Sequence, residues 1–211
     1  MNKEEFIKQV KELGIQLTEE QLTKLDKFYQ LLIEWNEKIN LTRITEKQEV
    51  YLKHFYDSLT IAKVVDLKEK TTLCDVGTGA GFPGIVLKIV YPNLKITLVD
   101  SLLKRVNYLN TIIKELELED IYAVHSRGED FRQTFDIVTA RAVANIEKLL
   151  NFTMHLVNKE GMFIAMKGNI EEELNEMVIS KINKKYNLLK IDKFLLPIEN
   201  SNRSLVVIKN K

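Results

Sequence analysis

Short β-rich runs alternate with helix-length segments in this sequence from residue 71 onward, and no other feature narrows its possible folds as far. Such alternation is typical of a parallel sheet wrapped by helices. Between the second and third runs, segment 101–117 carries apolar side chains three and four residues apart, which predicts an amphipathic helix. We expect the first five strands at 72–76, 95–100, 121–126, 135–140 and 162–167.

The end of the sequence departs from this alternation. A helix is expected at 169–184, but the two strand-like runs that follow, 188–198 and 204–210, are separated by only five residues. Five residues cannot form the helical crossover that parallel neighbours require, so these runs form a hairpin and one of them is antiparallel to the rest. The predicted fold is α/β, with a mostly parallel seven-stranded sheet and a C-terminal antiparallel strand.

The beginning of the sequence carries helical signals instead. Residues 2–5 and 18–21 have the spacing of capping boxes, and an apolar stripe follows each of them. A third helix is expected at about 54–64. We predict an N-terminal helical extension at 1–66 and a core domain at 67–211, packed together as one compact unit.

Composition favours a soluble globular protein of the cytoplasm. Of the 211 residues, 45% are hydrophobic and 29% charged, and no apolar run approaches the roughly 20 residues of a membrane helix. The first residues are acidic and amphipathic, unlike a signal peptide. We therefore expect a cytoplasmic protein with no membrane partner.

Cysteine and histidine usage argues against a disulfide framework and a metal site. Cys74 is the only cysteine, and its place in an apolar run favours a buried structural thiol over a nucleophile. His54, His125 and His155 share no ligand spacing, so no metal is expected.

Charge is distributed unevenly along the chain. The net charge is +1, but residues 181–211 hold eight basic and two acidic residues, a net +6 that leaves −5 for residues 1–180. This basic tail suits either a nucleic acid or an ordinary solvated surface.

Half of the eight glycines fall in the segment LCDVGTGAGFPG, residues 73–84. The first strand ends just before Gly77 and a helix is expected from about Pro83, so Gly77, Gly79 and Gly81 form a tight turn at the carboxyl edge of the sheet. Open α/β sheets bind ligands at this edge, and glycine lets a ligand approach the main chain. This arrangement predicts a cofactor site rather than a merely flexible turn.

Acidic residues at successive strand ends separate two kinds of ligand. Asp75 lies at the turn, where it would repel the pyrophosphate of a dinucleotide and attract the ammonium and sulfonium of S-adenosylmethionine. Asp100 ends the second strand and can accept hydrogen bonds from ribose hydroxyls. Glu129 follows the third strand, at the adenine end. We therefore expect S-adenosylmethionine as the cofactor.

Eight segments that span nearly the whole chain are more specific than the glycine turn: WNEKINLTRI (35–44), HFYDSL (54–59), DVGTGAGFPG (75–84), TLVDSLLKRVNYL (97–109), SRGED (126–130), ARAVA (140–144), MKG (166–168) and RSLVVIK (203–209). Together they resemble the RsmG/GidB family of bacterial methyltransferases. The resemblance implies a class I (Rossmann-like) methyltransferase fold and S-adenosylmethionine-dependent methylation of guanine N7 in 16S ribosomal RNA, in the loop near the decoding centre.

The family pattern also implies roles for residues at matching positions. Arg141 is expected near both the cofactor and the guanine, and arginine can donate two hydrogen bonds to guanine O6 or to a phosphate. Phe82 and Gly128 are expected to line the cofactor site. Gly128 departs from the alanine or valine expected there, which leaves the adenine contacts open.

Other candidates carry two interpretations each. His54 and Asp57 lie one turn apart and either hold the target or cofactor, as catalytic residues, or are ordinary residues of a surface helix. Four basic residues near strand ends predict a positive rim for RNA phosphates, although each alone is as compatible with a solvated surface. These residues are Lys104, Arg127, Lys167 and Arg203.

Absent motifs narrow the chemistry further. Amino-group methylation of adenine usually goes with an aromatic motif containing two prolines after the fourth strand, where this chain has TARAVAN, residues 139–145. Pyrimidine C5 methylation needs a cysteine nucleophile, and Cys74 lies before the glycine turn. Guanine N7 carries no proton, so attack on the methyl group needs no strong general base.

The expected partner is 16S ribosomal RNA, within the small subunit or an assembly intermediate, and the expected role is in rRNA processing by a monomer. Two alternatives remain open at this stage. One is a methyltransferase that acts on a small molecule or a protein. The other is a non-catalytic Rossmann-like module that senses NAD(H).

Overall fold

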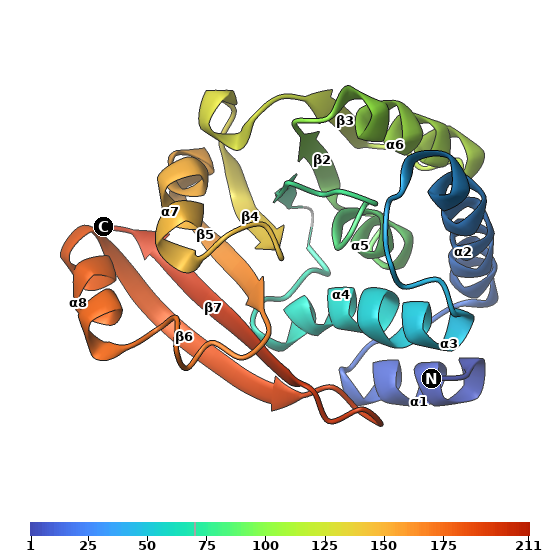
Figure 1. Ribbon diagram of the computed structural model, residues 1–211, viewed down its shortest axis with the longest axis horizontal. Helices are drawn as coiled ribbons and strands as arrows, with labels where there is room; N and C mark the ends of the chain where they lie inside the picture. The colour runs from blue at the N-terminus through green and yellow to red at the C-terminus, as the bar shows by residue number, and fades with distance from the viewer. Residues whose placement is uncertain (70) are drawn as a thin grey trace.

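The computed structural model describes residues 1–69 and 71–211 and has a seven-stranded sheet at its centre (Figure 1). The strands are β1 (Thr72–Val76), β2 (Lys95–Asp100), β3 (Ile121–His125), β4 (Phe135–Arg141), β5 (Val157–Lys167), β6 (Tyr186–Leu195) and β7 (Asn202–Asn210). Their order in the sheet is β3-β2-β1-β4-β5-β7-β6. Only β7 is antiparallel to its neighbours, β5 and β6, which confirms the predicted fold class and hairpin.

The strand order reverses between β1 and β4, which lie side by side in the middle of the sheet. The connections that leave these two strands run in opposite directions along the sheet, so a crevice opens at their carboxyl ends. The glycine turn follows β1, and Arg141 is the last residue of β4. The topology alone therefore brings these two sequence features to one edge.

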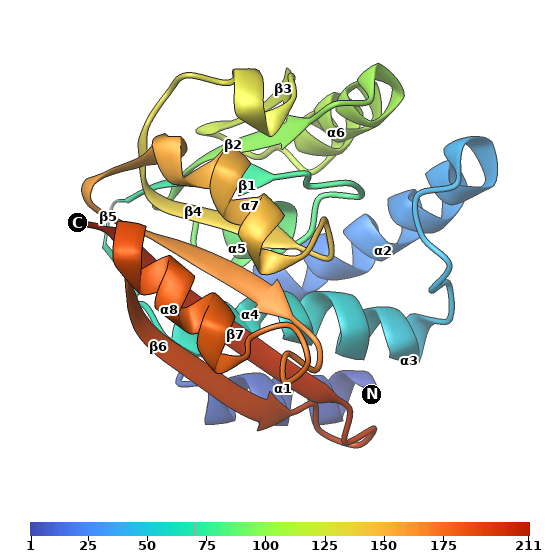
Figure 2. The same cartoon turned by 60° about the vertical axis from the view of Figure 1, so that its left-hand side comes forward.

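Helices cover both faces of the sheet (Figures 1 and 2). The N-terminal helices, with α5 and α6, share one apolar core with one face of the sheet, and α7 and α8 share a second core with the other face. The period of two along β1 makes this possible, because Leu73 belongs to the first core while Cys74 and Val76 belong to the second. The main helices are α1 (Lys3–Glu12), α2 (Glu19–Ile39), α3 (Lys47–Val50), α4 (Asp57–Leu59), α5 (Gly84–Val90), α6 (Leu103–Glu115), α7 (Ile146–Thr153) and α8 (Glu176–Lys185).

Both predicted capping boxes are present. The side chain of Asn2 accepts from the backbone N–H of Glu5, and that of Thr18 accepts from Gln21, with the reciprocal bonds also formed. Gly14, between α1 and α2, has φ +79°, so it turns the chain between the two helices.

The helix expected at 54–64 begins earlier than predicted. Helical backbone runs without a break from α3 through a π-helical stretch, Tyr51–Tyr56, and α4, and ends in a 3-10 turn, Thr60–Lys63. The earlier start is driven by burial rather than by a capping signal, because Val50, Tyr51 and Leu52 are all enclosed in the core. Similarly, α8 begins at Glu176 instead of residue 169, because Asn175 caps it through the N–H of Val178.

No helix in the described ranges, 1–69 and 71–211, is long and apolar enough to cross a membrane.

Candidate functional site

The alternating glycines form the turn between β1 and α5. Gly77, Gly79 and Gly81 have φ of +69°, +60° and +93°, which L side chains rarely adopt. A Cβ on Gly81 would lie 2.5 Å from Ile85 Cγ1, and one on Gly77 would lie 2.8 Å from Val143 Cγ2. Backbone conformation and packing both require glycine here.

Asp75 supports this turn from inside the protein. Its side chain is fully buried, and Oδ2 accepts hydrogen bonds from Thr78 Oγ1 at 2.7 Å and from Gly84 N at 2.9 Å. Burial raises the pKa of Asp75 to about 6, although these two hydrogen bonds oppose the shift. Oδ1 has no partner among the described residues. Asp75 is enclosed by the protein and does not line the cavities beside the turn, so its predicted contact with a cofactor ammonium stays a prediction.

Asp100, at the end of β2, holds the same turn from the side. Its Oδ2 accepts from Gly79 N and its Oδ1 from Leu102 N, each at 2.9 Å. Arg105 lies 3.5 Å from Oδ2. Because each carboxylate oxygen has two lone pairs, Asp100 can still accept a hydrogen bond from a ligand hydroxyl.

Two cavities adjoin at the glycine turn, and Gly77 lines both. The smaller, about 230 Å³, is also lined by Asp100, Gly128 and Glu129, the predicted contacts for ribose and adenine. The larger, about 560 Å³, lies beside it, toward the N-terminal helices and the ends of β4, β5 and β7. The site thus offers a smaller recess beside a larger chamber, with Gly77 in the wall of both.

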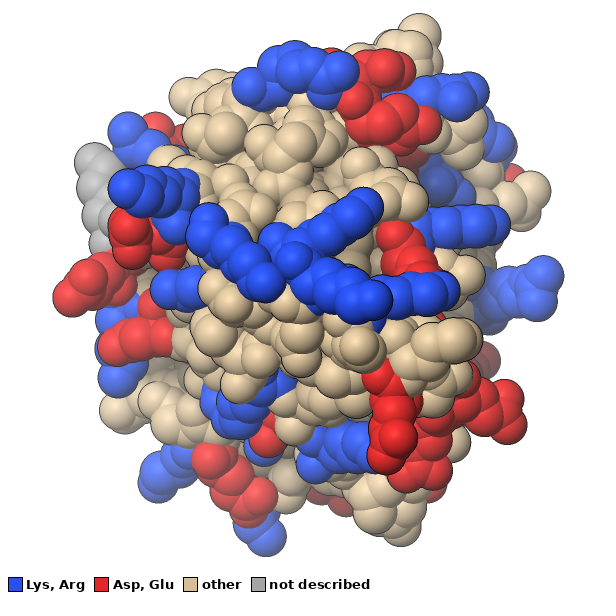
Figure 3. Space-filling view, turned by 90° about the vertical axis from the view of Figure 1, so that its left-hand side faces the viewer, with Lys and Arg blue, Asp and Glu red and all other residues tan. Residues whose placement is uncertain are grey.

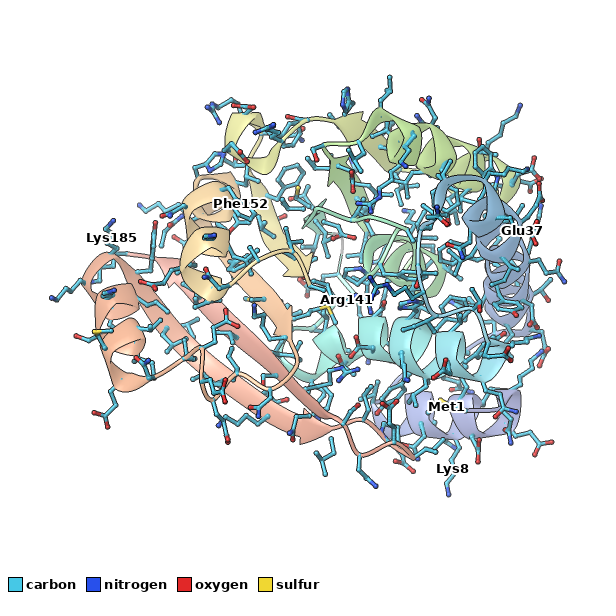
Figure 4. All side chains as sticks on the ribbon, viewed as in Figure 1. Met1, Lys8, Glu37, Arg141, Phe152 and Lys185 are labelled. Carbon is cyan, nitrogen blue, oxygen red and sulfur yellow. The ribbon has the colours of Figure 1, made fainter. Side chains whose placement is uncertain are left out.

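The glycine at position 128 has a packing explanation. A Cβ there would lie 2.9 Å from Val76 Cγ1 and 3.1 Å from the ring of Phe152, which is labelled on α7 in Figure 4. Phe152 also lines the smaller cavity. A bulky ring on α7 therefore occupies the space that an alanine or valine at 128 would need.

The larger cavity has a stack of three side chains in its wall. The imidazole of His54 lies parallel to the ring of Phe82, with centroids 4.4 Å apart, and the guanidinium of Arg141 lies over the same ring at 5.2 Å. Figure 4 shows Arg141 near the middle of the molecule, where β4 ends beside α4. The predicted residues Phe82, His54 and Arg141 are thus brought together.

Asp57 holds two arginines in this wall. Its Oδ2 accepts from Arg141 Nη1 and its Oδ1 from Arg203 Nε, both at 3.0 Å. Arg141 also donates to the backbone carbonyl of Lys53 at 2.9 Å. His54 and Asp57 are only 8% and 5% exposed, so their interpretation as ordinary residues of a surface helix is wrong.

His54 is neutral at physiological pH. Burial, and then the positive charge of Arg141, lower its pKa to about 3. Nδ1 lies 3.2 Å from Arg141 Nη2 and 3.1 Å from the carbonyl oxygen of Lys53, and Nε2 lies 3.0 Å from Thr42 Oγ1, so both ring nitrogens have polar partners. His54 therefore positions Arg141 and Thr42 rather than carrying charge.

The burial of His54 predicts a pH-dependent stability. Below pH 6.5 the unfolded chain protonates this imidazole while the folded protein does not, so stability falls as pH falls from 6.5 toward 3. Chemical denaturation at pH 7.5 and pH 5 should show wild type losing about 2 kcal/mol more than His54→Gln. Asp75, with its raised pKa, gains stability on acidification, but both proteins share that contribution. Equal losses in the two proteins would contradict a neutral, buried His54.

The four basic residues of the predicted positive rim fall into two groups, one exposed and one paired with carboxylates at the cavity. Lys104 and Arg127 are exposed, as a rim requires, and their contact with RNA phosphates stays a prediction. Lys167 is only 11% exposed and bonds to Glu173 at 2.9 Å and to the carbonyl of Ala144 at 2.7 Å. Lys167 and Arg203 are therefore not free cations, because each is already paired with a carboxylate at the cavity.

Residues 21–201 match the family described as rRNA small subunit methyltransferase G, GidB. The chain belongs to this family. Its relative from Bacillus subtilis, "Ribosomal RNA small subunit methyltransferase G", is 48% identical, with 99% of this chain and 90% of the relative covered. The relative of the same name from Bacillus velezensis is 46% identical over the same shares. Membership confirms the resemblance drawn from the eight sequence segments.

Solved structures of low sequence identity share the fold. A SAM dependent methyltransferase from Aquifex aeolicus superimposes with a TM-score of 0.59 at 17% identity, over 83% of this chain and 97% of that one. A ribosomal protein L11 methylase from Lactobacillus delbrueckii gives 0.53 at 17% identity, over 80% and 81%. The sheet therefore has the class I methyltransferase fold. Membership of the GidB family confirms the expected enzyme class and its cofactor, S-adenosylmethionine.

The residues present fit this cofactor of the GidB family. Gly77 lines both cavities, so a ligand that extends from one cavity to the other passes the glycine turn. The carboxylates of Asp100 and Glu129 line the smaller cavity beside the turn, and Asp75 lies buried behind the turn. These carboxylates favour a cationic ligand over a pyrophosphate.

Sequence reasoning missed three residues at this site. Val143 lies against Gly77 and lines the smaller cavity, Thr42 supports His54, and Glu173 holds Lys167. Val143 contacts Gly77, 66 positions away, and Thr42 contacts His54, 12 positions away. Glu173 is only six positions from Lys167, but it lies in a turn where a helix was expected. Among the residues that the structure describes, there is no group of three His, Cys, Asp or Glu side chains arranged to hold a metal ion.

Proposed function

We propose that this chain methylates N7 of a guanine in 16S ribosomal RNA, within the small subunit or an assembly intermediate of it. Family membership supports the reaction class, and the observation that carries the proposal is the larger cavity. This cavity adjoins the glycine turn, and two guanidinium groups, those of Arg141 and Arg203, lie in its wall. Guanidinium groups can bind an electron-rich base and its phosphate.

The cofactor would lie across the two cavities, with Asp100 toward its ribose and Glu129 toward its adenine. When bound, S-adenosylmethionine supplies an electrophilic methyl group on a sulfonium. Gly77, Gly79 and Gly81 leave room for main-chain contact, and Phe82 forms part of the chamber wall. These residues orient the donor and remove bulk water from the transfer path.

Arg141 would orient the guanine. Three of its hydrogen bonds fix the guanidinium, to Asp57, to Lys53 and to His54, yet none of the hydrogen bonds within the described part of the chain uses its Nε. A free N–H can donate to guanine O6 or to a phosphate. It would not donate to N7, because that would occupy the attacking lone pair.

The reaction requires no side chain at this site to accept or donate a proton. Guanine N7 is unprotonated and its lone pair lies in the ring plane, so in-line attack leaves no proton to remove. This agrees with His54, whose lowered pKa leaves it neutral and whose two ring nitrogens are both engaged. Catalysis then consists mainly of alignment.

Asp100→Asn tests the cofactor assignment. The amide cannot accept from both backbone N–H groups and a ribose hydroxyl as the carboxylate can, so affinity for S-adenosylhomocysteine should fall about tenfold in calorimetry. Glu115→Gln, an exposed carboxylate at the far end of α6, is the matched control and should bind as wild type. Unchanged affinity in Asp100→Asn would remove Asp100 from the cofactor site.

The substrate is tested with labelled S-adenosylmethionine and four acceptors: undermodified small subunits, naked 16S rRNA, small molecules and proteins. We expect label in RNA, with subunits or their precursors preferred. Label only in the small molecules or proteins would contradict the proposal. Tight NADH binding with no response to S-adenosylhomocysteine would instead identify a dinucleotide sensor.

A further inference from the structure

The basic C-terminal part of the chain forms a lysine cluster at the amino edge of the sheet, opposite the cofactor turn. We propose that this cluster, the amino-edge lysine patch, binds the phosphate backbone of ribosomal RNA as a second contact, remote from the transfer site. The inference rests on the proposed function. The patch consists of Lys159, Lys184, Lys185, Lys209 and Lys211.

Strand register gathers these residues. β6 and β7 pair at Tyr186 and Asn210, so Lys185 and Lys211, which flank this pair, lie side by side. The Nζ of Lys211 donates to the carbonyl of Lys184 at 3.1 Å, which places the end of the chain against the last turn of α8.

The start of β5 adds another lysine to the same edge. The side-chain amide of Asn210 donates to the carbonyl of Val157 at 3.0 Å, so Lys159, two residues further along β5, joins the patch. The opposite ends of the strands belong to the transfer site, where Arg203 lies near the start of β7. With a rise of about 3.4 Å per residue, the six residues from Arg203 to Lys209 separate the two sites by roughly 20 Å.

Basic side chains dominate this face. Figure 3 shows it with Lys and Arg in a row across the middle and tan surface rather than red between them. Figure 4 labels Lys185 at the outer end of α8, on the side of the molecule that Figure 3 turns to the viewer.

The patch lysines lack acidic partners. None of the ion pairs within residues 1–69 and 71–211 involves any of the five, whereas Lys181, one turn earlier on α8, is paired with Glu147 at 3.2 Å. The negative end of the α8 dipole favours Lys184 and Lys185 locally. It does not account for Lys159 and the β7 lysines, which lie on other elements.

The chemistry of the surface favours phosphates over a protein surface. Lysine is depleted at the centres of protein interfaces, which use aromatic and arginine anchors. The exposed neighbours of the lysines include two amides, Asn183 and Asn187, which can also donate to phosphate oxygens, and one acid, Glu160, beside Lys159. A row of unpaired cations with polar neighbours matches a polyanion that extends beyond the target base.

The test is Lys159→Gln/Lys184→Gln/Lys185→Gln, measured for binding to small subunits and to naked 16S rRNA at several salt concentrations. Each lost phosphate contact should reduce the steepness of log K against log salt by about 0.7 to 0.9, so the slope of the triple variant should be less steep by about 2 to 3. The KM for the RNA substrate should rise several-fold, with kcat and S-adenosylhomocysteine affinity unchanged, because the patch lies far from the transfer site.

The matched control is Lys8→Gln/Lys11→Gln/Lys114→Gln, three exposed lysines on α1 and α6 with the same change in net charge. A wild-type slope and KM in the patch variant, or an equal loss in the control, would overturn the proposal. Loss of binding to subunits but not to naked rRNA would assign the patch to a ribosomal protein and also overturn it. If wild type methylates no RNA, the proposed function is wrong, and the salt dependence of binding still shows separately whether the patch binds RNA.

Discussion

Arg141→Ala is expected to lower kcat/KM for methyl transfer by about 10² to 10³-fold while the protein stays folded. The guanidinium that would align the guanine is lost, but Asp57 keeps Arg203 as its partner and is not left as an unpaired buried charge. Initial rates with labelled S-adenosylmethionine and undermodified subunits give the effect, and thermal unfolding reports the fold.

Two further variants make this result specific. Arg141→Lys keeps the positive charge but lacks the planar guanidinium that contacts Asp57, Lys53 and His54 together. Most of the activity should therefore still be lost. Arg132→Ala removes a guanidinium that lies outside both cavities and should retain wild-type rates. Wild-type turnover in Arg141→Ala would exclude this residue from guanine alignment.

Asp57→Asn is expected to destabilise the protein by about 3 to 5 kcal/mol, the usual cost of removing one partner from a buried ion pair. The carboxylate is 5% exposed and bonds to both Arg141 and Arg203, so the amide would leave two guanidinium groups facing each other without a negative charge. Urea denaturation at pH 7.5 measures the loss.

An exposed ion pair provides the control for this change. Glu147→Gln makes the same carboxylate-to-amide substitution in the pair with Lys181, where both side chains are about half exposed, and should cost less than about 1 kcal/mol. If Asp57→Asn cost no more stability than Glu147→Gln, solvent would screen the charge of Asp57, and Asp57 would not hold the two arginines in place.

The features predicted correctly from the sequence are those set by local patterns. The strands of the sheet, the glycine turn and the two capping boxes follow from spacing within a few residues. The acids at the ends of β1 and β2 could be placed for the same reason, because parallel strands bring their carboxyl ends to one edge.

The features that were missed depend on contacts between distant parts of the chain. Asp57 pairs with residues 84 and 146 positions away, so no local pattern reveals that it bridges Arg141 and Arg203. Lys167, predicted as part of a positive rim or as a solvated surface residue, is instead nearly buried and paired with Glu173, which lies in a turn where a helix was expected. Charge in the sequence indicates a binding surface only after such pairs are known.

The proposed function depends on transfer of a methyl group to N7 of guanine, and mapping the modified base tests this transfer directly. Undermodified small subunits are incubated with the protein and S-adenosylmethionine, and the 16S rRNA is then cleaved chemically at 7-methylguanosine. We predict one new scission, at a guanine in the loop near the decoding centre, that is absent with Arg141→Ala. Methyl label that enters the RNA without producing any new scission would contradict the account.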